Sequence, residues 1–416
     1  MKQHILVVSQ YFYPEQFRIN DLCTEWFKRG YRVTVITGIP DYPQGRFYDG
    51  YGWFRKTKET YNGIDIIRLP IIPRGDNVFM LSLNYLSFVI SGFFWKAFTK
   101  IRADLVFIFE VSPMTQALIG VWYAKKIGIP CYLYVQDLWP ENVEVIAGIT
   151  NPFIIRSISK MVNYIYHNST RIFTTSNSFV TAINNRGVPL EKIEFWPQYA
   201  EDFYRPMEES IVDEIPQDGT FNITYTGNIG SAQGLDILPK AAVVLKTLGI
   251  KKRVRFNIIG DGRYKNTLVQ MINSMGVADM FNFIQPQPAS SIPKFLAASD
   301  VGFLSLIDNP LFRMTIPAKL QSYMACGIPI IAAADGETRD IIEASKSGRC
   351  CSAGDPDALA MLIVDMLDLS KEDLMQMGKN ACEYCSKFFN KQKLLDRMDR
   401  VFNEQYVSEA RYHVWE

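Results

Sequence analysis

Histidine is scarce in this chain, since only three occur among 416 residues, at His4, His167 and His413. None of the three stands in a recognisable catalytic or metal-binding pattern. The Asp-x-Asp sequence at 355–357 follows a glycine and precedes a predicted helix, so we interpret Asp355 as a helix N-cap. The sequence therefore predicts an activity that needs neither histidine catalysis nor a bound metal.

An excess of one sign of charge is also lacking, because 44 Lys and Arg side chains balance 43 Asp and Glu to a net charge of +1. Without a basic excess, a nucleic-acid-binding role is excluded. The seven cysteines are an odd number, and the first apolar run, residues 5–8, is too short for a secretory signal core. We therefore expect reduced thiols and a cytoplasmic protein.

Short apolar runs alternate with helical patterns along the chain. In the first half the predicted strands are residues 5–9, 32–38, 65–71, 104–109, 130–135 and 171–176. Regularity fails in the proline-bracketed segment 196–206, and the pattern then restarts with strands at 221–227, 254–262, 280–285, 300–306 and 328–334. This alternation predicts an α/β fold with two Rossmann-like domains, each with a parallel sheet, at residues 1–200 and 201–393.

The segment 311–338 carries the clearest chemical pattern. A predicted helix, residues 318–325, follows a turn that contains Arg313, and Lys319 lies in its first turn. A helix N-terminus with cations beside it stabilises a diphosphate. We therefore predict that Arg313 and Lys319 bind the diphosphate of a nucleotide. The alternative for Lys319 is a solvated position on the helix surface.

The pattern P-x-K-x-x-x-Y-M-A-x-G-x-P-I-I-A, from Pro317 to Ala332, resembles the donor-site segment of family 4 glycosyltransferases. The resemblance covers nearly the whole chain. It implies the GT-B fold, in which two Rossmann-like domains face each other across a cleft. The first domain would lie on the acceptor side, and the second would bind the nucleotide-sugar donor. It also implies that a last helix, about residues 394–416, packs back on the first domain.

A glycine turn after the strand at 221–227 is the predicted phosphate loop, because glycines let backbone N–H groups approach a phosphate closely. The resemblance assigns Gly227, Asn228 and Gly230 to this loop. Asn228 and Gln233 stand where the family usually has two basic residues, so Lys319 and Arg313 are expected to supply the charge instead.

Two further loops are expected at the rim of the nucleotide site, because each follows a strand of the second domain. They contain Asp261 and Gln285. In the resembling family this region reads the base through main-chain atoms. An ordinary strand-to-helix turn is the alternative for Asp261.

The donor helix departs from the family pattern, which commonly places two glutamates, with seven residues between them, to hold sugar and ribose hydroxyls. Met314 and Ser322 occupy those places here, and Tyr323 follows in the P-x-K-x-x-x-Y form. That form resembles a subgroup of bacterial surface-polysaccharide transferases (O-antigen, capsule and colanic acid), which includes N-acetylfucosamine transferases. Ser322 and Tyr323 are expected in the donor site, and Glu337 is a candidate to replace one carboxylate.

In the first half, Tyr13 and Glu15 directly follow the first strand, and Asn20 opens the next helix. A loop at the carboxyl end of the first strand faces the cleft in such folds. We predict that these three residues bind the acceptor and that Glu15 orients an acceptor hydroxyl. A purely structural carboxylate at the approach to the helix is the alternative for Glu15.

The strongest motif of the first half is Val135–Glu141, again just beyond a strand. It offers Asp137 and Glu141 as carboxylates and Trp139 as an aromatic face on which a sugar stacks. We predict a catalytic positioning role for Asp137 and acceptor contacts for Trp139 and Glu141. A simple turn is the alternative. The family's usual cleft histidine is replaced by Glu110.

Residues 77–95 form an uncharged run about long enough to span a bilayer. Three interpretations stay open: a core helix, a membrane span, or an amphipathic helix on an anionic membrane surface. Lys96, Lys100 and Arg102 follow at once and suit the last of these.

Together these patterns predict a retaining, metal-independent glycosyltransferase without a cofactor. Its donor would be a UDP-sugar that carries an N-acetylhexosamine or a deoxyhexosamine. Its acceptor would be a saccharide on polyprenyl diphosphate at the cytoplasmic leaflet of the membrane. The alternatives are a GT-B epimerase acting on UDP-N-acetylglucosamine and a non-catalytic nucleotide-sugar-binding protein of a polysaccharide assembly.

Overall fold

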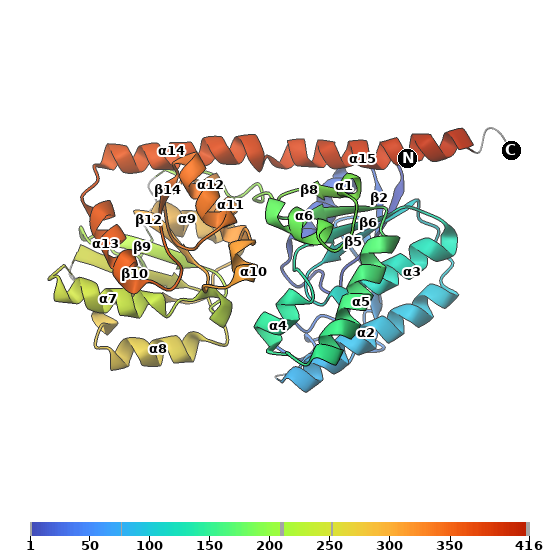
Figure 1. Cartoon of the computed structure of the whole chain (residues 1–416), viewed down its shortest axis with the longest axis horizontal. Helices are drawn as coiled ribbons and strands as arrows, with labels where there is room; N and C mark the ends of the chain where they lie inside the picture. The colour runs from blue at the N-terminus through green and yellow to red at the C-terminus, as the bar shows by residue number, and fades with distance from the viewer. Residues whose placement is uncertain (1, 76, 209–211, 251–252, 413–416) are drawn as a thin grey trace. The chain divides into compact units, whose positions relative to one another are not determined.

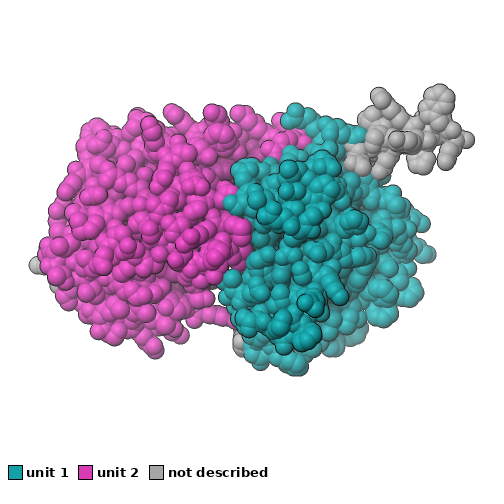
Figure 2. Space-filling view, in the orientation of Figure 1, with its two compact units in different colours: residues 1–196, 398–416 teal, residues 197–397 magenta. Residues whose placement is uncertain are grey.

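The computed structural model describes residues 2–75, 77–208, 212–250 and 253–412, and the chain forms two compact units. Unit 1 contains residues 1–196 and 398–416, and unit 2 contains residues 197–397 (Figure 2). Each unit is built on a sheet of its own. The chain therefore passes between the units twice, after Trp196 and after Arg397.

Unit 1 has an eight-stranded sheet in the order β3-β4-β2-β1-β5-β6-β7-β8. Its strands are β1 His4–Val8, β2 Arg32–Gly38, β3 Lys58–Tyr61, β4 Ile64–Leu69, β5 Leu105–Glu110, β6 Cys131–Val135, β7 Arg171–Thr174 and β8 Ile193–Phe195. Every pairing is parallel except that of β3 with β4. Strands β1, β5 and β6 are buried along their whole length, which explains their continuous apolar sequences.

The antiparallel edge strand β3 departs from the predicted all-parallel sheet. Its sequence, KETY, is polar and only partly buried, so no apolar run reveals it. A tight turn at Asn62–Gly63, with φ of 49° and 81°, joins it to β4. Two left-handed residues of this kind are typical of a two-residue hairpin. The sheet is therefore mixed at this edge.

Helices cover both faces of this sheet (Figure 1). They are α1 Arg18–Lys28, α2 Val78–Phe98, α3 Ala117–Ile127, α4 Glu141–Ala147, α5 Pro152–Asn168 and α6 Asn177–Asn184. Helices α2, α3 and α5 lie side by side in Figure 1, with α3 in contact with both of the others.

The last helix, α15 (Lys391–Tyr412), begins in unit 2 and continues in unit 1. Phe402 is fully buried there, with its ring centroid 5.7 Å from that of Trp26 on α1 and 5.3 Å from that of Tyr132 on β6. The Asp399 carboxylate pairs with Arg29 at 2.9 Å and accepts a hydrogen bond from Tyr31 at 3.0 Å. The C-terminal segment thus supplies part of the core of unit 1.

Helix α2 rests on unit 1 along a narrow stripe. Its buried residues are Asn84, Phe88 and Gly92, spaced four apart on one side of the helix. Asn84 donates to Asp41 and accepts from Gln10, both in unit 1. Among the described helices, α2 alone is long and apolar enough to cross a membrane, and only 17% of its most apolar window is buried. The core-helix interpretation of residues 77–95 is therefore wrong for most of the helix surface.

Unit 2 has a parallel six-stranded sheet in the order β11-β10-β9-β12-β13-β14. Its strands are β9 Phe221–Thr226, β10 Val254–Ile259, β11 Phe281–Ile284, β12 Val301–Ser305, β13 Ile330–Ala333 and β14 Gly348–Cys351. Its helices are α7 Ile237–Thr247, α8 Lys265–Ser274, α9 Ile292–Ala297, α10 Pro310–Arg313, α11 Ala318–Cys326, α12 Glu337–Ser345, α13 Pro356–Leu367 and α14 Lys371–Phe388. The predicted α/β class with two Rossmann-like sheets is confirmed.

Candidate functional site

The loops that follow β9 and β10 approach each other closely through glycine residues that have no side chain between them. Gly227 and Gly260 have φ of 124° and 147°, and a Cβ on Gly260 would lie 1.9 Å from the Gly227 carbonyl oxygen. A Cβ on Gly262 would similarly lie 2.3 Å from the Ile229 carbonyl oxygen. Only glycine fits at such approaches. The predicted phosphate loop is therefore a surface of main-chain groups at the end of the sheet.

Two buried tyrosines hold this loop in place. The Tyr225 hydroxyl donates to the Asn228 carbonyl oxygen at 2.6 Å, and the Tyr323 hydroxyl accepts from the Thr226 N–H at 2.9 Å. Tyr323 is fully buried, so it shapes the loop from behind instead of touching a ligand. Ser322, one residue earlier, is 6% exposed and donates to the Ala318 carbonyl oxygen within α11.

Lys319 reaches this loop from the first turn of α11. Its Nζ lies 3.8 Å from the centroid of the Tyr225 ring, and a Cβ on Gly227 would lie 3.9 Å from the same nitrogen. Within the described part of the chain, Nζ is buried and has no hydrogen-bond partner. The alternative of a solvated lysine on the helix surface is therefore wrong.

Burial lowers the pKa of Lys319 to about 7, because an ammonium group is poorly stabilised away from water. A buried cation without a hydrogen-bond partner is costly, and such a cost is characteristic of functional sites. A ligand anion between Lys319 and the glycine loop would restore the charge and satisfy the nitrogen. The arrangement therefore suits a phosphate group.

Gln233 and Asn228, which stand at the family's basic positions, have local roles. Gln233 Oε1 accepts from the Gly230 N–H at 3.0 Å and so caps a short 3-10 turn, Ser231–Gln233. The Asn228 side chain packs against Gly230 and Gly262. Lys319 Nζ, by contrast, lies close to Gly227 and Tyr225.

The other predicted donor residues lie closer to solvent. Arg313 is exposed and pairs with Asp308 at 2.7 Å, while Asp261 accepts from the Gly262 N–H and lies 3.7 Å from Lys265. Gln285 is exposed at the end of β11, and Glu337 is the first residue of α12. Arg313 is therefore the weaker candidate for binding a diphosphate, since its charge is already paired with that of Asp308.

In unit 1, Glu15 is turned into the protein. Its carboxylate accepts backbone N–H groups of Asp41 at 2.9 Å, Tyr42 at 2.7 Å and Phe12 at 3.3 Å. Only 3% of Glu15 is exposed, and burial raises its pKa to about 8. This geometry favours the structural alternative, in which Glu15 joins the loops after β1 and β2.

Asn20 and Tyr13 support the same loop. Asn20 accepts from the Tyr13 N–H at 3.1 Å and donates to the Glu15 carbonyl oxygen at 2.7 Å. The Tyr13 ring is partly exposed and stacks on Tyr61, with centroids 3.9 Å apart. Of the three predicted acceptor residues in this loop, Tyr13 and Asn20 are partly exposed, whereas Glu15 is buried.

Asp137 and Glu110 form a pair of carboxyl groups at the ends of β6 and β5. Asp137 Oδ2 accepts from the Ser112 N–H at 2.6 Å, and Glu110 Oε2 accepts from the Asp137 N–H at 3.4 Å. Burial raises the pKa of both, and the neighbouring Asp137 raises that of Glu110 further. The sequence prediction did not include Glu110 among the site residues. The feature that could have revealed it is a carboxylate at the end of an otherwise apolar strand.

Trp139 and Glu141 do not lie as predicted. Trp139 is 7% exposed and its indole N–H donates to Ser112 at 3.0 Å, so it has no open face for a sugar. Glu141 pairs with Arg186 at 2.7 Å in the first turn of α4. The sugar-stacking prediction is wrong for Trp139, and Glu141 stabilises local structure.

Sequence reasoning also missed a polar cluster around Arg74. Its guanidinium donates to the Tyr11 hydroxyl at 2.6 Å and lies 5.2 Å from the Tyr42 ring centroid. Its backbone N–H donates to Asp41 at 2.8 Å, and burial raises the pKa of Asp41 to about 6. Because these residues come from loops separated in sequence, no local motif marks them.

Among the described residues, no group of three or more His, Cys, Asp or Glu side chains is placed to hold a metal ion. Asp355 Oδ1 accepts from the Ala358 N–H at 2.9 Å, at the start of α13. The N-cap interpretation of the Asp-x-Asp sequence is thus confirmed.

Two family models match the chain: the glycosyl transferase 4-like domain over residues 16–198 and the glycosyl transferases group 1 over residues 207–384. An Escherichia coli (strain K12) protein whose name is colanic acid biosynthesis glycosyl transferase WcaI is 26% identical over 328 residues, 76% of this chain and 78% of that protein. Sucrose-phosphate synthase from Thermosynechococcus elongatus has a TM-score of 0.77 at 16% identity, covering 98% and 100% of the two chains. Anabaena HepE, solved with UDP and glucose, has a TM-score of 0.69 at 15% identity, covering 97% and 100%.

Proposed function

This chain belongs to the family 4 glycosyltransferases of the GT-B fold, and on that premise we propose that it moves a sugar from a UDP-sugar to a lipid-linked saccharide. The product would be part of a bacterial surface polysaccharide, as the name of the colanic acid relative suggests. The observation that carries the proposal is the buried Nζ of Lys319 beside the bare glycine loop. The presence of UDP in HepE supports UDP as the nucleotide.

Lys319 would act on the leaving group. As the bond between the sugar and the diphosphate breaks, negative charge grows on the diphosphate. A preorganised cation in a site shielded from water stabilises that charge strongly, and backbone N–H groups of the glycine loop add to it. Stabilisation that increases toward the transition state raises the rate of the chemical step.

The family resemblance supports transfer with retention and without a metal. In that mechanism the acceptor attacks from the face that the leaving group vacates, and the leaving phosphate helps to take the acceptor proton. Asp137 would position the acceptor through hydrogen bonds to its hydroxyl groups, and the fully buried Glu110 would hold Asp137 in place by accepting its backbone N–H. An N-acetylhexosamine or a deoxyhexosamine is the proposed sugar.

Incubation with a panel of UDP-sugars and a lipid-linked acceptor, in the presence of EDTA, tests this proposal. We expect release of UDP and a product with the anomeric configuration of the donor. Loss of turnover in EDTA, or an inverted product, would contradict the mechanism. Conversion of the UDP-sugar without acceptor would identify an epimerase, and binding without turnover would identify a nucleotide-sugar-binding protein.

The proposed lipid-linked acceptor would place the enzyme at the cytoplasmic face of the membrane. Helix α2 supports this, because Phe79, Phe94 and Phe98 are 70%, 57% and 80% exposed. Its opposite side is fixed to unit 1 by Asn84 and Phe88, which favours a helix lying on a membrane surface over a helix that spans it. Attachment would be reversible and would depend on anionic lipid.

Replacing Phe79, Phe94 and Phe98 by serine is expected to weaken binding to anionic vesicles roughly 100-fold, since each partly inserted ring contributes about 1 kcal/mol. Vesicle co-sedimentation and UDP binding would be measured together, and UDP affinity should stay unchanged. The matched control replaces Leu248, Met361 and Met375 by serine. These apolar side chains are 51%, 53% and 57% exposed, and they belong to unit 2. Equal vesicle binding by both triple variants would contradict the surface role of α2.

A further inference from the structure

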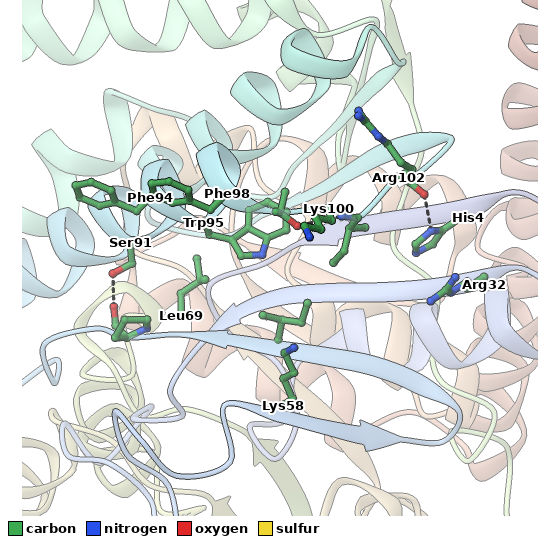
Figure 3. Close-up of a pocket in the computed structure, with 14 residues that line it drawn as sticks. His4, Arg32, Lys58, Leu69, Ser91, Phe94, Trp95, Phe98, Lys100 and Arg102 are labelled. Carbon is green, nitrogen blue, oxygen red and sulfur yellow. Dashed lines mark hydrogen bonds between the residues drawn. The ribbon is translucent and has the colours of Figure 1, made fainter.

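A groove of about 960 Å³ lies in unit 1, between the C-terminal half of α2 and strands β3 and β4. Its two ends differ in chemistry (Figure 3). Phe94, Phe98 and Leu69 line the apolar end, while Arg32 and Arg102 lie at the other end. A long cavity that is apolar at one end and cationic at the other is complementary to an amphiphile with an anionic head.

The cations of the groove are poorly neutralised. Within the described parts of the chain, Lys58, Lys100 and Arg102 have no ion-pair partner, and Arg32 faces Asp65 only at 3.7 Å with both side chains exposed. Such an exposed pair contributes little. Cations gathered around one opening repel one another, and a bound phosphate relieves that repulsion.

The basic end has a fixed backbone. His4 Nδ1 bonds to the Arg102 carbonyl oxygen at 3.0 Å and His4 Nε2 to Thr34 at 2.8 Å. The Asp104 carboxylate accepts from the His4 N–H at 2.6 Å, which turns this acid toward the backbone. The segment that carries Lys100 and Arg102 is therefore held against the sheet.

The basic end lies at the edge of the sheet opposite the candidate acceptor groups. His4 and Arg32 are the first residues of β1 and β2, whereas Tyr13 and Asp137 follow the carboxyl ends of β1 and β6. A seven-residue strand such as β2 separates the two edges by about 20 Å. A head group bound here is thus remote from the reacting acceptor, which argues for a lipid of the bilayer.

We propose that this groove binds one anionic phospholipid, with its phosphate between Arg32, Lys100 and Arg102 and an acyl chain along Phe94 and Leu69. The inference rests on the proposed membrane-surface function, since Phe94 and Phe98 line the groove and also belong to the exposed face of α2. It adds a specific lipid site to general attraction by charge. The bound lipid would orient unit 1 on the membrane.

The test uses the full chain and phosphatidylcholine vesicles with or without phosphatidylglycerol. The Lys100→Gln/Arg102→Gln variant should bind the anionic vesicles about 100-fold more weakly, because each charge-assisted contact to the lipid phosphate that is lost is worth roughly tenfold. The control variant, Lys96→Gln/Lys125→Gln, removes the same charge from α2 and α3 outside the groove and should lose markedly less. Equal losses in both variants would reduce the effect to general electrostatics and overturn the proposal.

A second measurement locates the lipid. Phosphatidylglycerol with brominated acyl chains should quench Trp95, which lines the groove, and Trp95→Phe should remove that part of the quenching. Quenching unchanged in Trp95→Phe would overturn the proposal. So would displacement of the lipid by inorganic phosphate, which indicates a free-anion site, or by a polyprenyl phosphate, which indicates an acceptor site.

Sugar transfer to a water-soluble acceptor analogue separates this inference from the proposed function. The Lys100→Gln/Arg102→Gln variant should keep wild-type turnover in that assay. If the wild-type chain transfers no sugar while the lipid measurements give the expected results, the proposed function fails and the lipid site stands.

Discussion

Lys319→Met is expected to lower kcat/KM about 10- to 150-fold, the value of a charge-assisted contact of about 1.5–3 kcal/mol to phosphate. The same change should raise the free energy of unfolding by roughly 1–4 kcal/mol, because it replaces a buried ammonium that has no hydrogen-bond partner among the described residues by an apolar side chain. Activity and stability would therefore move in opposite directions. Steady-state kinetics and chemical denaturation measure the two effects.

The pH dependence of stability gives an independent signature of Lys319. Its pKa is about 7 in the folded chain against an ordinary value of 10.5, so the unfolded chain binds the proton more tightly. The free energy of unfolding should therefore rise as pH increases from about 7 toward 10, and this rise should be smaller in Lys319→Met. UDP affinity should fall over the same range, because the neutral amine no longer attracts the diphosphate.

Lys379→Met, on the exposed surface of α14, is the matched control and should change neither activity nor this pH profile. Arg313→Ala is the informative comparison, because Arg313 is exposed and already paired with Asp308. A larger loss of kcat/KM in Arg313→Ala than in Lys319→Met would transfer the phosphate role to Arg313.

Gly260→Ala is expected to destabilise unit 2 by about 3 kcal/mol or more and to abolish UDP binding in the chains that remain folded. The new Cβ would lie 1.9 Å from the Gly227 carbonyl oxygen, in a backbone conformation with φ of 147°. The loops after β9 and β10 would have to separate, which removes the main-chain surface proposed to hold the diphosphate. Thermal melting and UDP titration measure the two consequences.

Gly249→Ala provides the control, because Gly249 also has a positive φ, 77°, but a Cβ there would meet no atom within 4 Å. The Gly249→Ala variant measures only the free-energy cost of a positive φ for alanine, about 1 kcal/mol, without a collision between loops. If Gly260→Ala melts like Gly249→Ala and still binds UDP, the close approach of the two loops is not what shapes the donor site.

The predictability of this fold follows from the burial of its strands. Strands such as β1 and β5 are buried on both faces, so their sequences are continuous apolar runs that identify them without further information. Strand β3 was not predicted, because its KETY sequence lies at the edge of the sheet and contains no apolar run. Local composition therefore reveals central strands and misses an edge strand.

The sequence indicates where the candidate site lies more readily than it indicates what each of its residues does. The loops after β1, β6 and β9 are candidates because ligands bind at the carboxyl ends of the strands in α/β sheets. The burial of Lys319 depends on Tyr225, nearly a hundred residues earlier, and the carboxylate of Glu15 is occupied by Asp41 and Tyr42. Such long-range partners decide whether a polar side chain meets a ligand or the protein itself, and no local pattern encodes them.

The return of the chain to unit 1 has a consequence for the folding of this protein during translation. Phe402 fills a fully buried place beside Trp26, yet about 200 residues of unit 2 are translated between Trp196 and Met398. At about 5–20 residues per second, the ribosome needs roughly 10–40 seconds to make them. During that interval the nascent first domain lacks part of its core, so the faces of Trp26 and Tyr132 that Phe402 covers stay open until the last helix is made.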